Sequence, residues 1–201
     1  MKREKGASMR SLEENMILVR YPGPGNSREL GEKILLLEQI AWPSKGEEEP
    51  FPSAPNTYVT SFILLEGERA ICHVGVRKST LSHCGQAYTA YGLSEVVTHP
   101  GYRKKGIASR LVKEALAFIH SKQADLCIFT CNPRVAPFYA QLGFEQLIGC
   151  CFVGGTKERP LRSDQLSLLT LAAFLSPRAE AHRGDFQHAD LLFYLGENQL
   201  W

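Results

Sequence analysis

Apolar residues recur along the chain with two different periods, and together these periods predict a mixed αβ protein. Runs rich in β-branched and aromatic residues, bounded by Gly, Pro and polar clusters, predict strands over 15–21, 58–66, 69–77, 86–98, 125–131, 144–153 and 185–195. Apolar residues at helical spacing predict helices from Ser27 to Pro43, from Gly106 to about Lys122, and over 133–142. The segment 164–175 fits either strand or helix by periodicity, and we favour a strand.

The order of these elements predicts how the strands connect. Glu66-Gly67-Glu68 favours a hairpin turn, and Gly92 favours a bulge or splay point within its strand. Helices after the first and fourth strands suit a twisted, mostly antiparallel sheet with helices on both faces. One strand pair must be parallel where the Gly106 helix crosses between strands. The segments 154–162 and 177–184 are expected to be loops.

Composition and charge narrow the class of protein. The 201 residues are 44% hydrophobic, enough for a proper core, and we expect a flexible arm over 1–14 followed by a single domain over 15–201. The 23 Lys and Arg against 21 Asp and Glu give a net charge of +2, too balanced to indicate nucleic acid as a partner. No apolar run approaches the roughly 20 residues of a membrane helix, and the N-terminus lacks a signal-peptide core. We therefore expect a cytoplasmic protein without a membrane partner, and a homodimer stays open.

The six cysteines carry no recognisable metal or redox pattern. They stand at positions 72, 84, 127, 131, 150 and 151, without a C-x-x-C pair or a histidine at zinc-finger spacing. We interpret them as small buried hydrophobic residues in a reducing compartment, and we expect no metal site. A nucleophilic cysteine has no local signature here.

The stretch 93–112 has the order strand, basic loop, helix. Pro100-Gly101 stops the strand, and the loop Arg103-Lys104-Lys105 leads to Gly106, where the helix begins. The first backbone N–H groups of a helix have no partner inside it, and the helix dipole adds partial positive charge, so this order predicts a phosphate site. Gly106 has no Cβ, which lets a phosphate approach the backbone. The alternative is an ordinary connection with a solvated basic loop.

Two motifs in this region resemble the signatures of the GNAT acyltransferase superfamily. Residues 103–108 resemble its coenzyme A loop, Arg/Gln-x-x-Gly-x-Gly/Ala, with a Val-x-x-x-Pro run just before it. In the second motif Asn132, Tyr139 and Gly143-Phe144 occur at the spacing of that superfamily. The resemblance covers 15–152, and it implies the GNAT fold with acetyl-CoA lying between two diverging strands.

The resemblance also implies which residues bind acetyl-CoA. The exposed backbone of 96–98 would pair with pantetheine like an added strand, and the N–H of Val97 could stabilise the oxyanion. The loop 103–109 would take the diphosphate. The residues expected to bind the cofactor are Val96, Val97, Thr98, Arg103, Lys104, Lys105, Gly106, Ile107, Ala108, Ser109 and Asn132.

Two residues are candidates for proton transfer when the acetyl group passes to an amine. Tyr139 could act as general acid toward the coenzyme A thiolate, since a phenol has a pKa near 10 and a thiol about 8.5. The alternative for Tyr139 is a core tyrosine packing a short helix. Glu95 could act as base, directly or through water, and strand alternation would place it on the same side as Val97. The alternative for Glu95 is a solvent-facing strand residue.

The end of the chain suggests an acceptor. Residues 189–201 resemble the tail of the aminoglycoside 2'-N-acetyltransferases, which also finish on a Trp whose carboxylate faces the sugar amines. Trp201 and Glu95 are therefore expected to contact the amine, because a carboxylate pairs with an ammonium. Gln199 and Ser94 stand where those enzymes carry acids. The resemblance implies an acetyl-CoA-dependent N-acetyltransferase acting on a small aminoglycoside-like or polyamine substrate.

Other interpretations of the acceptor stay open. It could be a protein N-terminus, a lysine or a small metabolite amine. The same fold could instead serve as a non-catalytic acetyl-CoA sensor. Glu47-Glu48-Glu49 could form an acidic rim for a cationic substrate, but we favour a solvated loop over 44–55.

Overall fold

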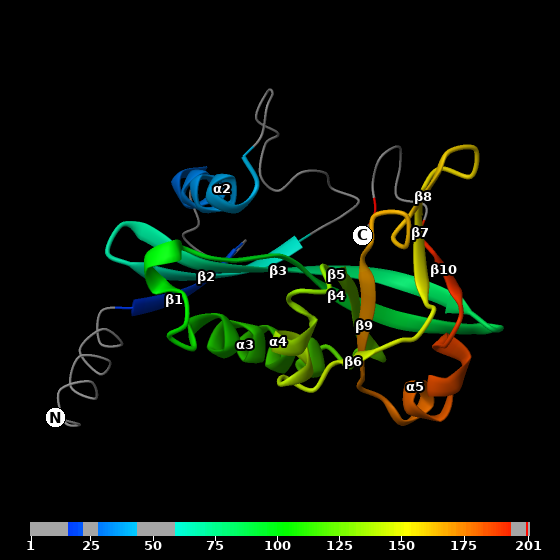
Figure 1. Ribbon diagram of the computed structural model, residues 1–201. Coiled ribbons are helices and arrows are strands. Elements are labelled where there is room, and N and C mark those ends of the chain that lie inside the picture. Colours follow the sequence, from blue (N-terminus) through cyan, green and yellow to red (C-terminus); the bar gives the residue numbers. More distant parts are fainter. Residues whose placement is uncertain (1–15, 22–27, 44–58, 194–199, 201) are drawn as a thin grey trace, which may run out of the picture. The chain divides into compact units, whose positions relative to one another are not determined.

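The computed structural model describes residues 16–21, 28–43, 59–193 and 200, which form a mixed αβ structure (Figure 1). The chain divides into two compact units. The first comprises Met1–Ser53, Thr60–Gly75 and Glu95–Val112, and the second comprises Ala54–Val59, Val76–Ser94 and Lys113–Trp201. The arm expected over 1–14 lies outside the described residues. None of the described helices is long and apolar enough to cross a membrane.

Strands make up most of the regular structure. They are β1 (Met16–Tyr21), β2 (Val59–Glu66), β3 (Arg69–His83), β4 (Gln86–Thr98), β5 (Leu126–Cys131), β6 (Glu145–Gln146), β7 (Cys151–Gly155), β8 (Pro160–Arg162), β9 (Leu169–Phe174) and β10 (Asp190–Leu192). The helices are α2 (Arg28–Ala41), α3 (Ile107–Ser121), α4 (Ala136–Ala140) and α5 (Pro177–Ala181), with short 3-10 helices η2 (Pro100–Tyr102) and η3 (Arg183–Phe186). β3, β4 and α3 each have residues in both units. The single domain expected over 15–201 stays a prediction.

The larger sheet has seven strands in the order β1-β2-β3-β4-β5-β9-β6. Most of its pairs are antiparallel, whereas β4 and β5 pair in parallel, as a crossing helix requires. The parallel register is short, since it joins only Ala90 to Leu126 and Tyr91 to Cys127, and both strands continue beyond it. The expected fold, a mostly antiparallel mixed sheet flanked by helices, is confirmed.

In the first unit, α2 lies against the sheet through one apolar stripe. Leu30, Ile34 and Leu37 are buried there in one cluster with Ile63 and Val97. Burial of each such side chain stabilises the fold by about 1.5–3 kcal/mol. The same spacing predicted this helix from the sequence.

A buried polar chain joins α2 to the strands of the first unit. His73 is fully buried, with its Nδ1 2.9 Å from Oε1 of Glu38 and its Nε2 2.8 Å from Oγ of Ser61. Ser61 is fully buried as well. A buried polar group that loses its partner destabilises the protein, so these contacts fix the position of α2 on the sheet.

In the second unit, Asp125 holds the start of β5. Its carboxylate accepts hydrogen bonds from the N–H of Thr89 at 2.8 Å and the hydroxyl of Ser176 at 2.7 Å, and it forms an ion pair with Arg178. Burial acts to raise the pKa of Asp125, but these three interactions outweigh it and the pKa is lowered. Asp125 therefore stays ionised and links β4, β5 and α5.

The expected single strand over 144–153 is wrong. The chain instead forms the two-residue strand β6, turns over 147–150, and enters β7, which belongs to a separate sheet of order β10-β7-β8. Gly149 makes this turn possible, because its φ is +64° and a Cβ would collide with the ring of His188. A continuous apolar run does not reveal such a break.

Four further segments differ from expectation. The loop expected over 154–162 is partly strand, since β7 reaches Gly155 and β8 pairs with it. The connection expected over 177–184 contains α5, whose first turn is capped by a hydrogen bond from Ala179 N–H to Ser176 Oγ, and the start of η3. The last strand is limited to β10, and the short helix expected over 133–142 is limited to α4.

The other elements follow the sequence pattern. The strands β1, β2, β4 and β5 and the helices α2 and α3 lie within one or two residues of their expected bounds, and β9 confirms the strand favoured within 164–175. β3 is longer than expected and runs to His83.

All six cysteines are free, and five are buried. Burial raises the pKa of Cys72 and Cys131 to about 11 and that of Cys150 to about 12. The interpretation as buried small residues is therefore confirmed for five of the six. It is wrong for Cys84, which is exposed because it lies in the tight turn between β3 and β4.

Replacement of Ser61 by Ala is expected to lower the free energy of unfolding by roughly 1–3 kcal/mol, because it leaves Nε2 of His73 buried without its partner. Urea denaturation followed by circular dichroism measures the change. Ser79→Ala is the matched control, since Ser79 lies in β3 but makes only a 3.5 Å contact to the next carbonyl. Equal effects of the two substitutions would contradict the role of the buried chain.

Candidate functional site

The candidate residues fall into two groups, one in each unit. The first group lies at the end of β4 and the start of α3, and the second lies at the end of β5 and in α4. In the part of the chain that the structure describes, no three His, Cys, Asp or Glu side chains are arranged to hold a metal ion.

Glu95 interrupts the regular geometry of β4. Its φ of +48° lies in the left-handed region, which strands do not use, and this is typical of a bulge. Positive φ therefore occurs at Glu95 and not at Gly92, where a bulge or a splay point was expected. The parallel pairing of β4 with β5 ends at Tyr91, directly before Gly92, which agrees with a splay point there. Side-chain alternation does not continue through such a residue, so it no longer supports a common side for Glu95 and Val97. Glu95 is half-buried, whereas Val97 is buried in the α2 cluster.

The helix η2 stands between β4 and the basic loop, and the sequence pattern did not reveal it. Nδ1 of His99 accepts a hydrogen bond from Gly101 N–H at 3.2 Å, which caps the turn, and Pro100 occupies its first position. Proline at the first position of a helix is a usual signal, because its fixed φ suits that position. The His99-Pro100-Gly101 sequence thus contained a signal for the start of η2.

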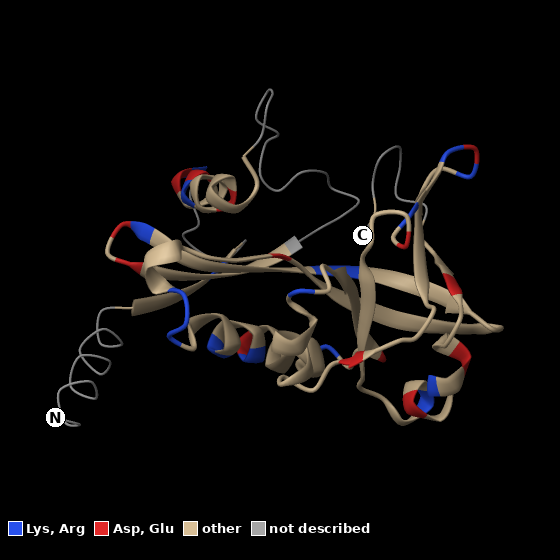
Figure 2. Ribbon diagram, in the orientation of Figure 1, with Lys and Arg blue, Asp and Glu red and all other residues tan. Residues whose placement is uncertain are grey.

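Two of the three basic loop residues make contacts within the protein. Nε of Arg103 donates to the carbonyl of Thr98 at 3.0 Å, and Nζ of Lys105 lies 5.1 Å from the ring centroid of Tyr102. Oγ1 of Thr98 lies 3.2 Å from Sγ of Cys72. The carbonyl of Thr98 is therefore engaged. Residues 103–105 are exposed, and they form the blue loop that leads into α3 in Figure 2.

Helix α3 begins as the sequence predicts. The N–H of Arg110 donates to the carbonyl of Gly106 at 3.0 Å, so Gly106 is the residue that caps the helix. No acceptor among the described residues engages the amides of Ile107, Ala108 or Ser109. These amides and the helix dipole give the first turn a partial positive charge.

Gly106 has the conformation that its position requires. Its φ is +76°, and a Cβ built there would meet nothing within 4 Å. Lys104 also has a positive φ, of +61°. The space in front of the loop backbone is therefore open.

Tyr139 lies in α4, and aromatic rings surround it. Its ring centroid is 4.8 Å from that of Phe129, 4.9 Å from that of Phe138 and 6.0 Å from that of Phe144, all in edge-to-face arrangements. Only 6% of the residue is exposed, and burial raises the pKa of its phenol above the ordinary value. Tyr139 therefore keeps its proton, and its ring also packs the core as the alternative interpretation expected.

Asn132 shapes the turn that follows β5. Its Oδ1 accepts a hydrogen bond from Arg134 N–H at 3.0 Å, and its carbonyl accepts one from Val135 N–H at 3.0 Å. The side-chain oxygen is thus used by the turn. The NH₂ group is the part of Asn132 that could bind a ligand.

Some candidates lie outside the described residues. These are Trp201, Gln199 and the acidic segment Glu47-Glu48-Glu49. One contact near the loop had no signal in the sequence, namely the hydrogen bond that the hydroxyl of Tyr102 donates to Glu66. It joins the η2 turn to the end of β2, which is far away in the sequence.

Comparison with known proteins identifies the family. Residues 47–147, about half of the chain, match the family described as "Acetyltransferase (GNAT) domain". The chain belongs to the GNAT acetyltransferases. No protein of curated function matches it significantly in sequence.

Solved structures share this GNAT fold. A GNAT acetyltransferase from Brucella melitensis, solved with acetyl-CoA, is 15% identical with a TM-score of 0.57 over 90% of this chain and 96% of that chain. Escherichia coli ElaA is 10% identical with a TM-score of 0.57 over 78% of this chain and 98% of that chain. A probable N-acyltransferase from Enterococcus faecalis is 23% identical with a TM-score of 0.55 over 66% of this chain. The chain spans 33% of the length of that protein.

The start of α3 fits the diphosphate of acetyl-CoA. Its amides have no acceptor within the described part of the chain, and the space in front of Gly106 is open. Such amides, together with the cations of the basic loop, are the groups that bind phosphate at helix N-termini. The resemblance to the aminoglycoside 2'-N-acetyltransferases stays a hypothesis about the acceptor.

Gly106→Val is expected to weaken acetyl-CoA binding at least tenfold, because a β-branched residue is strained at this φ and its side chain would enter the space before the amides. Gly85→Val is the matched control, since Gly85 has a φ of +74° and equally open surroundings in the β3–β4 turn. Titration calorimetry with acetyl-CoA, on variants shown to be folded, measures both. The control should lose stability but bind normally, and equal affinities of the two variants would overturn the loop assignment.

Proposed function

We propose that this GNAT protein transfers an acetyl group from acetyl-CoA to a primary amine. The observation that carries the proposal is the first turn of α3, where three amides that find no acceptor among the described residues follow a basic loop. The family match and the fold support the same chemistry. Acetyl-CoA would supply the acetyl group as a thioester, which is activated toward attack by an amine.

In this proposal the loop and the helix start hold the diphosphate. Arg103, Lys104 and Lys105 supply formal charge, and the amides of 107–109 supply directed donors. The backbone of Val96 and Val97 in β4 would hold the pantetheine amides. Positioning of this kind lowers the barrier because it replaces a bimolecular encounter by a bound one.

Tyr139 is the proposed proton donor to the departing sulfur. Burial raises the pKa of its phenol, so the hydroxyl is protonated throughout the physiological range and is available as a donor. A raised pKa also makes full loss of the proton less favourable. We therefore assign Tyr139 the role of a hydrogen-bond donor that shares its proton with the sulfur.

Glu95 stays the proposed base for the amine. Glu95 is a half-buried residue at an irregular point of β4, next to the backbone assigned to pantetheine. The left-handed conformation of Glu95 costs free energy in a non-glycine residue. Conformations of this kind are common at functional sites, which supports a role for the residue or for its backbone.

The acceptor is proposed to be a small amine of the aminoglycoside or polyamine class. The support is the resemblance of residues 189–201, in which Trp201 would bring a carboxylate to an ammonium. A protein N-terminus, a lysine side chain or a small metabolite amine is the second candidate. The third candidate is a function without catalysis, that of an acetyl-CoA sensor. Tyr139 at the superfamily position favours an enzyme over a sensor.

A thiol-release assay with acetyl-CoA tests these alternatives. The panel comprises aminoglycosides, polyamines, N-terminal peptides, lysine peptides and small metabolite amines. Release of thiol with aminoglycosides or polyamines supports the proposal, and release only with peptides favours the second candidate. Tight binding of acetyl-CoA without release on any amine supports the sensor and overturns the enzymatic proposal.

Tyr139→Phe is expected to lower kcat at least tenfold with little change in acetyl-CoA affinity, because it removes the proton donor but keeps the ring packing. In the parent protein kcat should hold up to about pH 10, because the raised pKa keeps the phenol protonated there.

Tyr88→Phe is the matched control for this prediction. Tyr88 is a buried tyrosine of the second unit, and no hydrogen-bond partner among the described residues holds its hydroxyl. Its replacement should leave kcat unchanged. An unchanged kcat in the Tyr139 variant would remove Tyr139 from the mechanism.

A further inference from the structure

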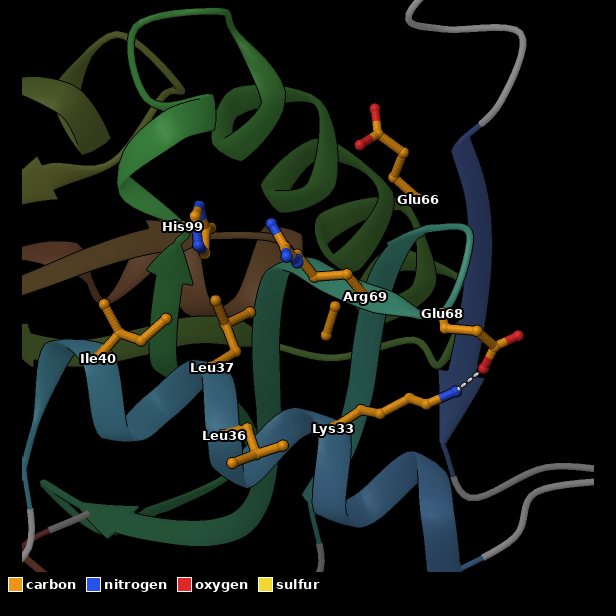
Figure 3. Close-up of a pocket in the computed structure, with 9 residues that line it drawn as sticks. Lys33, Leu36, Leu37, Ile40, Glu66, Glu68, Arg69 and His99 are labelled. Atoms are coloured by element: carbon orange, nitrogen blue, oxygen red, sulfur yellow. Dashed lines mark hydrogen bonds and ion pairs between the residues drawn. The ribbon is translucent and has the colours of Figure 1, made fainter.

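A hollow of about 770 Å³ lies in the first unit, between α2, the β2–β3 hairpin and the end of β4 (Figure 3). Its volume is in the range of small-molecule sites. None of its lining residues is among those assigned to acetyl-CoA or to acetyl transfer. The lining residues used below are Lys33, Leu36, Leu37, Ile40, Arg69 and His99.

One wall of the hollow is apolar. Leu36, Leu37 and Ile40 of α2 line it, and Leu37 and Ile40 point toward the end where His99 lies (Figure 3). Leu36 is 64% exposed and Ile40 is 45% exposed, four residues apart on the same helix face. Burial of this exposed apolar surface by a ligand would be favourable.

Both cations and carboxylates line the hollow, and Arg69 is the lining cation that no described carboxylate pairs with. Lys33 of α2 is paired with Glu29 at 3.0 Å and with Glu68 of the β2–β3 hairpin. Glu66 accepts the hydrogen bond from Tyr102 described above. Arg69 is exposed, and no described residue forms an ion pair or hydrogen bond with its guanidinium. That group reaches toward His99 (Figure 3).

His99 offers a second donor at the same end of the hollow. Its Nδ1 accepts the hydrogen bond from Gly101 N–H, so in the neutral ring the proton is on Nε2. A neutral His99 can therefore donate to a ligand through Nε2. Together with the guanidinium of Arg69, it forms a pair of donors suited to a carboxylate.

We propose that this hollow binds a small monocarboxylate with an apolar body. The carboxylate binds Arg69 and Nε2 of His99, and the apolar body lies along Leu36 and Ile40. Glu66 and Glu68 at the rim repel a doubly charged anion, which favours a monocarboxylate over a phosphate ester. This site is independent of the proposed acetyl transfer and gives the first unit a second small-molecule ligand.

The experiment is titration of the full chain with octanoate, followed by calorimetry. Saturable binding is expected, with at least a tenfold loss of affinity in Arg69→Gln and a clear loss in Ile40→Ser. Three compounds should bind more weakly than octanoate. Acetate lacks the apolar chain, octanol lacks the negative charge, and octyl phosphate carries a second negative charge that Glu66 and Glu68 repel. Arg134→Gln is the matched control, since Arg134 is exposed and does not line the hollow.

Three outcomes would overturn the proposal. They are no saturable octanoate binding up to its solubility limit, equal affinity in the parent protein and Arg69→Gln, and equal affinity for acetate and octanoate. Circular dichroism shows whether each variant is folded, and Arg69→Lys, which keeps the charge, should retain part of the affinity. The acetyl-CoA affinity of Arg69→Gln should be unchanged, so a failure of this proposal is separable from a failure of the proposed function.

Discussion

The first turn of α3 leaves backbone amides that none of the described residues engages, and the proposed chemistry depends on this. A helix that starts in open space must satisfy its first N–H groups with water or with a ligand. Here the start is fixed by Gly106, which caps the helix in a conformation unfavourable for other residues. The basic loop before Gly106 adds positive charge, and its side chains make few contacts with the rest of the described structure. Backbone geometry would thus make the proposed anion site, and side chains would only reinforce it.

The strand that leads to this turn contributes through its irregularity. Glu95 holds a left-handed conformation within β4, and the strand ends three residues later at Thr98, whose carbonyl is closed off by Arg103. Backbone that is extended yet not fully paired is what an amide-bearing ligand such as pantetheine requires. The packing of Val97 against α2 holds this segment in place. The site and the core of the first unit are therefore built from the same strand.

The surroundings of Tyr139 show how burial is compatible with the donor role proposed for it. Three aromatic rings fix the orientation of its own ring, and the low dielectric around it keeps the phenol protonated. A rigid donor of this kind stabilises a developing negative charge without having to reorganise. The packing of Tyr139 in the core is thus compatible with its proposed role as donor.

Periodicity predicted the elements that carry the proposed anion site, because β4 and α3 are long and strongly patterned. It failed in the C-terminal part of the chain. There a glycine turn at Gly149 splits an apolar run between two sheets, and short elements such as α5 depend on local caps. The left-handed Glu95 could not be foreseen, since only the tertiary structure holds a glutamate in that conformation. The bond between Tyr102 and Glu66 was equally hidden, because it joins distant parts of the chain.

The difference in exposure among the cysteines allows opening of the folded core to be followed by thiol labelling. Cys84 alone among the six is open to solvent, whereas the others are shielded by the folded core. A maleimide dye added to the native protein would therefore attach at the β3–β4 turn first. The other five thiols would react only when the structure opens. The number of dye molecules bound per chain over time would therefore measure how often the core opens.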